Sequence, residues 1–170
     1  IAFGNTVVLK PAEGSSHVAT LIAESALAAG LPAGVFNVVL GSGAVLGPSL
    51  LNAAPVRGVS FTGSAAVGAQ VAAAAAGRNI RYQTEMGGKN VAIVLPDADL
   101  AQAAALTAAG AMRYAGQKCT ATSRVVVARE VESAFLSRLR EQVAGLSLGP
   151  VTDPKAAGGP VITERSKQFI

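Results

Sequence analysis

The sequence predicts an α/β protein in which short strands and longer helices alternate. Runs of β-branched residues, typical of buried strands, are separated by alanine-rich stretches of helical length. The chain is 51% hydrophobic but only 4% aromatic, so its apolar mass consists mainly of Ala, Val and Leu. Helices built from such small residues pack closely on a sheet, and helical connections of this length imply right-handed crossovers in a mainly parallel sheet.

The first half of the chain contains four predicted strands joined by three helices. Pro11 closes the first strand because proline cannot continue a central hydrogen-bond ladder. Ser15 or Ser16 is available to cap the first helix, and Gly30 to end it. The predicted strands are 6–10, 35–40, 56–61 and 80–84, and the helices are 16–29, 45–52 and 64–76.

The pattern changes after Gly87 and Gly88, where we expect a domain boundary. A strand, a long alanine-rich helix, a loop, a second strand and a second helix follow, at 91–95, 99–114, 115–123, 124–128 and 130–143. Residues 163–170 are typical of a helix that stops partway through its pattern, and the chain has no initiator Met. We therefore expect a fragment of a longer protein.

Composition and charge disfavour several classes of partner. The net charge of +4 is spread over 14 basic and 10 acidic residues, without the basic run that a nucleic-acid groove needs. The uncharged stretch between Glu24 and Arg57 is broken by Gly and Pro, so no apolar run approaches the ~20 residues of a membrane span. We expect neither nucleic-acid nor membrane binding and no metal site. A single cysteine and no signal peptide favour the cytoplasm.

The single cysteine, Cys119, lies in the loop Gly116-Gln117-Lys118-Cys119-Thr120, downstream of Glu85. A thiol nucleophile can trap a carbonyl compound, and a carboxylate can activate water to release the product. Considered individually, each residue has a simpler interpretation. A lone cysteine is more often buried and inert, and Glu85 is also compatible with a structural acid at a domain boundary.

Lys10 and Glu13 follow the first predicted strand, where open α/β sheets bind ligands. A lysine and a carboxylate at this place can both hydrogen-bond ribose hydroxyls, although a solvated strand end is the simpler interpretation. Gly41-Ser42-Gly43 matches a dinucleotide fingerprint only weakly, because its third glycine, Gly47, falls one position late.

The segment Phe61-Thr62-Gly63-Ser64 joins a predicted strand to a predicted helix. Ser64 is placed to cap that helix, and the free amides at a helix start attract phosphate. A capping serine without any ligand explains this segment equally well.

Together these segments resemble the aldehyde dehydrogenase superfamily throughout the chain. The resemblance runs from residues 4–11 to the last predicted helix. The most specific matches, in the family's order and at its spacing, are Phe61-Thr62-Gly63-Ser64, Glu85-Met86-Gly87-Gly88-Lys89-Asn90 and Gly116-Gln117-Lys118-Cys119. Leu is commoner in the family at position 86, and Met conserves its volume. The resemblance implies a Rossmann-like parallel sheet in residues 1–86, as part of an NAD(P)-binding domain. It implies the start of an α/β catalytic domain in residues 87–170.

The resemblance also implies roles for individual residues. Cys119 is expected to be the nucleophile, and Glu85 the general base that hydrolyses the thioester. Lys10 and Glu13 fall on the adenosine-ribose positions, and Gly63 and Ser64 at the helix start near the pyrophosphate. A carboxylate at Glu13 favours NAD over NADP, although some relatives accept both. The Cys119 amide supplies half of the oxyanion hole; the family's other donor, an Asn, precedes this segment.

Several functions remain open within and outside this resemblance. Glu85 argues for hydrolysis rather than acyl transfer to coenzyme A. The run around Cys119 is most similar to the branch that oxidises 2-oxoglutarate semialdehyde; a broad aliphatic or succinic semialdehyde dehydrogenase is the alternative. The parent protein is expected to be a homodimer or homotetramer. A catalytically inactive cofactor-binding fragment is the alternative of another class, and intact Cys119 and Glu85 disfavour a structural protein with a dead enzyme fold.

Overall fold

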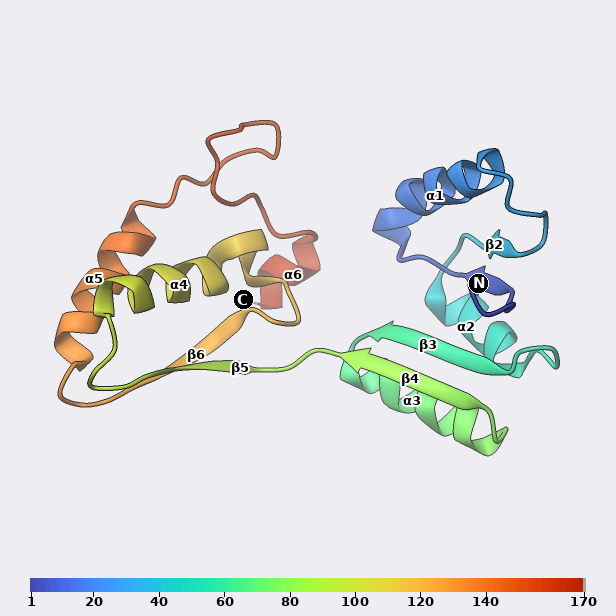
Figure 1. Ribbon diagram of the computed structural model, residues 1–170, viewed down its shortest axis with the longest axis horizontal. Helices are drawn as coiled ribbons and strands as arrows, with labels where there is room; N and C mark the ends of the chain where they lie inside the picture. Colours follow the sequence, from blue (N-terminus) through green and yellow to red (C-terminus); the bar gives the residue numbers. More distant parts are fainter. Residues whose placement is uncertain (170) are drawn as a thin grey trace. The chain divides into compact units, whose positions relative to one another are not determined.

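The computed structural model describes residues 1–169, which form two compact units (Figure 1). Unit 1 comprises 1–62 and 66–85, and unit 2 comprises 63–65 and the chain from Met86 onward. The chain thus passes from one unit to the other next to the paired glycines. The assignment of cofactor binding to residues 1–86 and of catalysis to residues 87–170 remains a prediction.

The first half of the chain alternates strands and helices in the predicted order. Its elements are β1 (Val7–Leu9), the 3-10 turn η1 (Glu13–Ser15), α1 (Ser16–Ala28), β2 (Phe36–Val38), α2 (Gly43–Asn52), β3 (Gly58–Gly63), α3 (Ala65–Gly77) and β4 (Arg81–Met86). Gly30 ends the first helical segment with a φ of 90°, as predicted. Ser15 occupies the N-cap position of α1, but its hydroxyl donates back to the Ala12 carbonyl and does not cap the helix.

The strands pair two by two. β1 and β2 are parallel, with Val7 opposite Phe36 and Leu9 opposite Val38, so the carboxyl ends of both strands lie at the same edge. β3 pairs with β4, and their arrows point the same way in Figure 1. The prediction of parallel strands joined by helices is confirmed. Within residues 1–169 the strands form three two-stranded sheets. The sequence does not predict which strands pair, because pairing depends on contacts between residues far apart in the chain.

The second half contains β5 (Asn90–Val94), α4 (Leu100–Met112), the 3-10 turn η2 (Arg113–Gly116), β6 (Thr122–Val127), α5 (Glu132–Ala144) and α6 (Glu164–Phe169). β5 and β6 are parallel, and α4 and α5 lie on the same side of them in Figure 1. The core of this unit contains Val94, Ala104 and Phe135, one from each of β5, α4 and α5. Alanine at the helix contact lets α4 approach its neighbours closely.

The predicted helix over 99–114 is too long at its end. Asp99 caps α4 by accepting hydrogen bonds from the amides of Ala101 and Gln102, at 3.0 and 3.1 Å. The helix stops at Met112 because Tyr114 and Ala115 adopt φ values of 56° and 53°, which an α-helix cannot accommodate. Alanine-rich composition predicts a continuing helix, whereas the backbone turns here toward the loop that holds the thiol.

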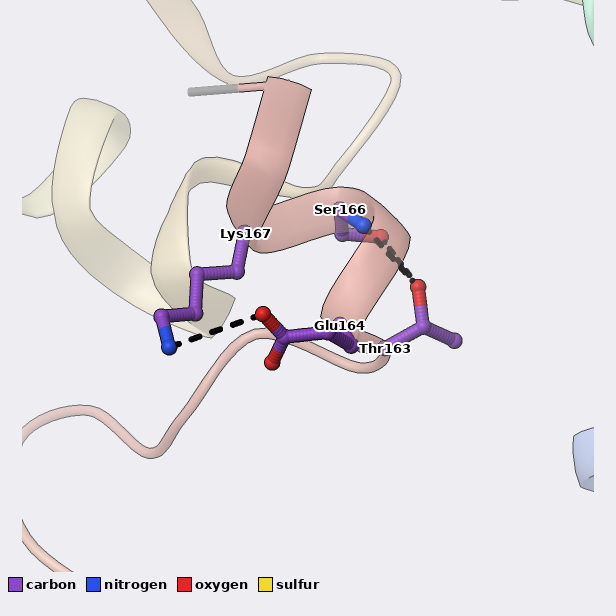
Figure 2. A network of polar contacts seen from close by, with 4 residues as sticks. All are labelled: Thr163, Glu164, Ser166 and Lys167. Carbon is purple, nitrogen blue, oxygen red and sulfur yellow. Dashed lines mark hydrogen bonds and ion pairs between the residues drawn. The ribbon is translucent and has the colours of Figure 1, made fainter.

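The last helix begins with local polar contacts, shown in Figure 2. The Thr163 hydroxyl oxygen accepts from the Ser166 amide at 3.0 Å, which satisfies one of the free amides at the start of α6. Lys167 and Glu164 form an exposed ion pair at 3.6 Å, a contact of little energetic weight. The predicted helix over 163–170 is thus confirmed for 164–169, and residue 170 lies outside the described residues. In the described part of the chain, no helix combines the length and apolar character needed to cross a bilayer.

Candidate active site

Cys119 lies in the loop between η2 and β6, and its side chain is exposed. Burial, the common state of a lone cysteine, therefore does not apply. An exposed thiol is open to attack a small electrophile, which a packing cysteine is not. The exposure in this chain agrees with the expectation of a reactive thiol, and the role of nucleophile stays a prediction.

The backbone is strained just before residues 117–121, the thiol loop that joins η2 to β6. Tyr114, Ala115 and Gly116 have φ values of 56°, 53° and 68°, three consecutive left-handed residues of which only one is glycine. Such conformations are costly for residues with a Cβ and persist only where the surroundings enforce them; they cluster at functional sites. A Cβ at Gly116 would stand 3.0 Å from the Ala111 carbonyl oxygen, so glycine is needed here for space as well as for φ.

Hydrogen bonds of Gln117 hold the amino-terminal side of the thiol loop. Its side-chain amide donates to the Tyr114 carbonyl at 3.3 Å, and its amide oxygen accepts from the backbone N–H of Ile162 at 3.1 Å. The next residue, Lys118, places its ammonium 4.2 Å from the centre of the Tyr114 ring, a cation–π contact. These contacts hold the residues that precede Cys119.

Hydrogen bonds of Asn90 hold the carboxyl-terminal side of the thiol loop. Its side-chain amide donates to the carbonyl of Cys119 at 2.7 Å and to the carbonyl of Ala121 at 3.2 Å. The sequence places Asn90 in one of the family motifs but does not indicate a role for it. The sequence shows that Asn90 follows two glycines and a lysine, but it cannot show a contact with Cys119, 29 residues further along the chain.

Glu85 is the penultimate residue of β4 and is exposed. Gln83 lies two residues earlier, hence on the same face of the strand, and its amide donates to the Glu85 carboxylate at 3.1 Å. An exposed carboxylate is a competent proton acceptor for water. Glu85 belongs to unit 1 and Cys119 to unit 2.

Lys10 links the carboxyl ends of β1 and β2. Its ammonium donates to the carbonyl of Pro11 and, at 3.3 Å, to the carbonyl of Gly41, which follows β2. Glu13 begins η1, and its carboxylate is exposed. An ammonium and a carboxylate therefore lie on neighbouring turns at the edge where parallel sheets bind ligands. This pair of groups suits the hydroxyls of a ribose.

The starts of two helices follow strand ends in this half of the chain. Ser42 caps α2 by accepting from the Ala44 amide at 3.2 Å. Gly63 is the last residue of β3, and Ser64 leads directly into α3, which begins at Ala65. The strand-to-helix connection predicted at Gly63 and Ser64 is confirmed; phosphate binding there remains a prediction. Among residues 1–169, no three His, Cys, Asp or Glu side chains are grouped so that they could hold a metal ion.

Comparison with known proteins matches the family model described as "Aldehyde dehydrogenase family" to residues 1–170. An alpha-ketoglutaric semialdehyde dehydrogenase of Bacillus subtilis is 42% identical over 164 residues, which are 96% of this chain and 34% of that protein. A betaine aldehyde dehydrogenase of Cereibacter sphaeroides is 42% identical over 171 residues, covering 100% of this chain and 35% of that protein. The chain thus spans about a third of the length of these curated relatives.

Solved structures share the fold. An NAD-dependent aldehyde dehydrogenase from Sinorhizobium meliloti has a TM-score of 0.94 and 39% identity, over 96% of this chain and 32% of that one. A 1-pyrroline-5-carboxylate dehydrogenase from Thermus with bound NAD has a TM-score of 0.92 and 34% identity, over 98% and 33%. An NADP-dependent enzyme of Escherichia coli has a TM-score of 0.92 and 38% identity, over 95% and 34%.

Proposed function

The chain belongs to the aldehyde dehydrogenase family, and on that premise we propose that it carries the cofactor-binding and thiol-bearing parts of an enzyme that oxidises an aldehyde to a carboxylic acid. The observation that carries the proposal is the exposed thiol of Cys119, held in a loop between two fastened sides. A solvent-accessible thiol in a fixed backbone is the requirement for a carbonyl nucleophile. The strained backbone at Tyr114 and Ala115 supports the same assignment.

The proposed reaction begins at the sulfur of Cys119. The thiolate attacks the aldehyde carbon, an S–C bond forms, and the carbonyl electron pair moves to oxygen to give a thiohemiacetal. The backbone N–H of Cys119 donates to this oxygen and stabilises its developing charge. A nicotinamide cofactor held near Lys10, Glu13 and Ser64 would supply the acceptor for the hydride of the thiohemiacetal carbon. The thioester that remains is attacked by water as the Glu85 carboxylate takes the water's proton, and the acid and the Cys119 thiolate are released.

The residues at the edge of the β1–β2 pair fit a nicotinamide dinucleotide. Lys10 and Glu13 supply a donor and an acceptor for ribose hydroxyls, and Gly63 and Ser64 join β3 to α3, where the positive end of the helix dipole suits a pyrophosphate. We propose NAD as the preferred cofactor, because the Glu13 carboxylate repels the 2′-phosphate of NADP. The relatives include enzymes described with either cofactor, so use of NADP is the alternative.

The proposed substrate is a semialdehyde, with 2-oxoglutarate semialdehyde as the first candidate. The B. subtilis relative carries that specificity in its name, and the residues around Cys119 resemble that branch. Betaine aldehyde is the second candidate because a relative of equal identity is named for it. The proposal also retains a cytoplasmic location and a homodimeric or homotetrameric parent protein. A chain that binds cofactor without turnover remains the competing proposal.

The test uses the full-length protein that contains this chain, with NADH formation followed from the first turnover. Cys119→Ser is expected to abolish both the NADH burst and steady turnover, a loss of at least about 10³-fold. Glu85→Gln is expected to keep the burst but slow steady turnover by about 10²-fold or more, since hydrolysis loses its base. Glu24→Gln changes an equally exposed glutamate elsewhere in unit 1 and should leave both phases unchanged. Turnover that survives Cys119→Ser refutes the proposal.

The same assay identifies the product branch and the substrate. Hydrolysis through Glu85 requires NADH formation without coenzyme A, and strict dependence on coenzyme A would contradict that role. We expect a higher kcat/KM for 2-oxoglutarate semialdehyde than for succinic semialdehyde or betaine aldehyde. The reverse order would reject the substrate and leave the thiol chemistry standing. Titration of the 170-residue chain with NAD tests the competing proposal: cofactor binding without a burst supports a cofactor-binding fragment.

A further inference from the structure

We propose that Asn90 is a positioning residue for Cys119, a role that rests on the proposed thiol chemistry. The first residue of β5, Asn90 reaches the thiol loop with its side chain while its backbone belongs to the sheet. It thereby links the β5–β6 pair of unit 2 to the residue that bears the nucleophile. In this role Asn90 sets the direction in which Cys119 is held and need not contact the substrate.

Both hydrogens of the Asn90 amide are used in this link. An asparagine side chain has two N–H donors, and here the same nitrogen lies 2.7 Å from the Cys119 carbonyl oxygen and 3.2 Å from that of Ala121. The backbone N–H of Ala121 also donates to the Lys118 carbonyl at 3.1 Å, which closes a turn around Cys119. Because a peptide unit is planar, fixing the Cys119 carbonyl fixes the plane that follows its Cα.

Asn90 is itself held by a change of register between β5 and β6. Asn90 pairs with Thr122, whereas Val91 pairs with Arg124, so Ser123 is an extra residue on β6. The Ser123 hydroxyl donates to the Asn90 backbone carbonyl at 3.2 Å and so occupies this irregularity. Such bulges redirect side chains and are common next to active sites. The bulge explains how a strand residue comes to face a loop rather than a neighbouring strand.

Only a side chain with two donors in this place can bind two carbonyl oxygens. Aspartate has nearly the same shape as asparagine, but its ionised carboxylate has no donor and repels both carbonyls. Asn90→Asp therefore removes the link without creating a cavity. A nucleophile that is displaced from its attack geometry loses rate in the chemical step rather than cofactor affinity. The expected signature is a fall in kcat with the KM for NAD unchanged.

The experiment compares Asn90→Asp with Asn37→Ala in the full-length protein. Asn37 is an exposed asparagine whose amide also bridges two carbonyl oxygens, those of Val7 and Gly34, but on β2 of unit 1. We expect Asn90→Asp to lower the NADH burst rate and kcat by about tenfold, in line with the loss of two hydrogen bonds. Hydrogen exchange in the peptide containing 117–121 should become faster. Asn37→Ala should change neither quantity.

A burst rate within about twofold of the parent, or the same change in Asn37→Ala, overturns the proposal. If Asn90→Asp does not fold, Ser123→Ala is the second variant. It removes only the bond to the Asn90 carbonyl and should slow the burst by about twofold to fivefold; an unchanged rate with unchanged exchange overturns the proposal. Hydrogen exchange at 117–121 separates this proposal from the function itself. Even if Cys119→Ser retained activity, faster exchange in Asn90→Asp would show that Asn90 holds the loop.

Discussion

At the scale of single residues, sequence and structure contribute differently to the candidate site. Cys119 and Glu85 stand out in the sequence because their types are rare or reactive and their neighbours match a family motif. The structure adds that both side chains are exposed in this chain, which the sequence does not reveal. Asn90 shows the opposite case: an ordinary polar residue becomes important only through its contact with the Cys119 carbonyl.

Glu13 provides a prediction at this scale. Its exposed carboxylate is expected to disfavour the extra phosphate of NADP, so Glu13→Gln should raise the ratio of kcat/KM for NADP to that for NAD. A change of about 1.4 kcal/mol in this charge interaction corresponds to about tenfold in the ratio. The measurement is NADH and NADPH formation by full-length protein at saturating aldehyde. Glu24→Gln serves as the control, and an unchanged ratio in Glu13→Gln would remove Glu13 from the cofactor site.

At the scale of elements, the close packing predicted from small residues is confirmed where α4 meets β6. A Cβ placed on Gly110 would stand only 2.8 Å from the Thr122 hydroxyl oxygen. Thr122 begins β6 immediately after the thiol loop, and its β-branched side chain has few alternative rotamers. Gly110 thus allows the helix to lie against the start of the strand that follows Cys119.

We expect Gly110→Ala to lower the free energy of unfolding by about 1 kcal/mol in total. The clash of the new Cβ with Thr122 outweighs the better helix propensity of alanine, which by itself is worth about 1 kcal/mol. In a Thr122→Ala background the clash is absent, and the same substitution should become neutral or stabilising. Gly77→Ala is the control, because a Cβ at Gly77 meets nothing within 4 Å. Chemical denaturation of the four members of this double-mutant cycle measures the coupling. Equal effects of Gly110→Ala in both backgrounds would exclude the contact as the cause.

At the scale of the whole molecule, the chain is built as two compact units. The core of unit 2 depends on one large side chain: Phe135 is fully buried, against Val94 and Ala104. In the described part of the chain it is the largest fully buried residue. Most of the residues packed around Phe135 are Ala and Val. Their short side chains cannot move far into the space that a smaller residue at position 135 would leave.

Phe135→Ala should therefore lower the free energy of unfolding of unit 2 by about 3–5 kcal/mol. Phe3→Ala is the matched control, because Phe3 is 96% exposed and its loss should cost less than about 0.5 kcal/mol. Hydrogen exchange in denaturant, read separately for peptides of the two units, measures both effects. Protection of β5 and α4 that is equal in the two variants would show that Phe135 is not the centre of this core.

The sequence by itself determined the α/β class, the order of the elements and the motifs that carry the family resemblance. These features are local, because strand and helix periodicity, caps and short motifs are all encoded within a few residues. The predicted end of α4 is wrong. Alanine-rich composition favours a continuing helix, whereas the surroundings enforce a left-handed turn at Tyr114 and Ala115.

Only the tertiary structure decided which strands pair, that Cys119 is exposed, and that Asn90 and Gln117 hold the two sides of its loop. Each of these depends on residues far apart in the chain. The energy of such contacts comes from hydrogen bonds and packing that no local pattern records. The thiol chemistry proposed for Cys119 can therefore be predicted from the sequence, whereas the geometry of its loop depends on the fold.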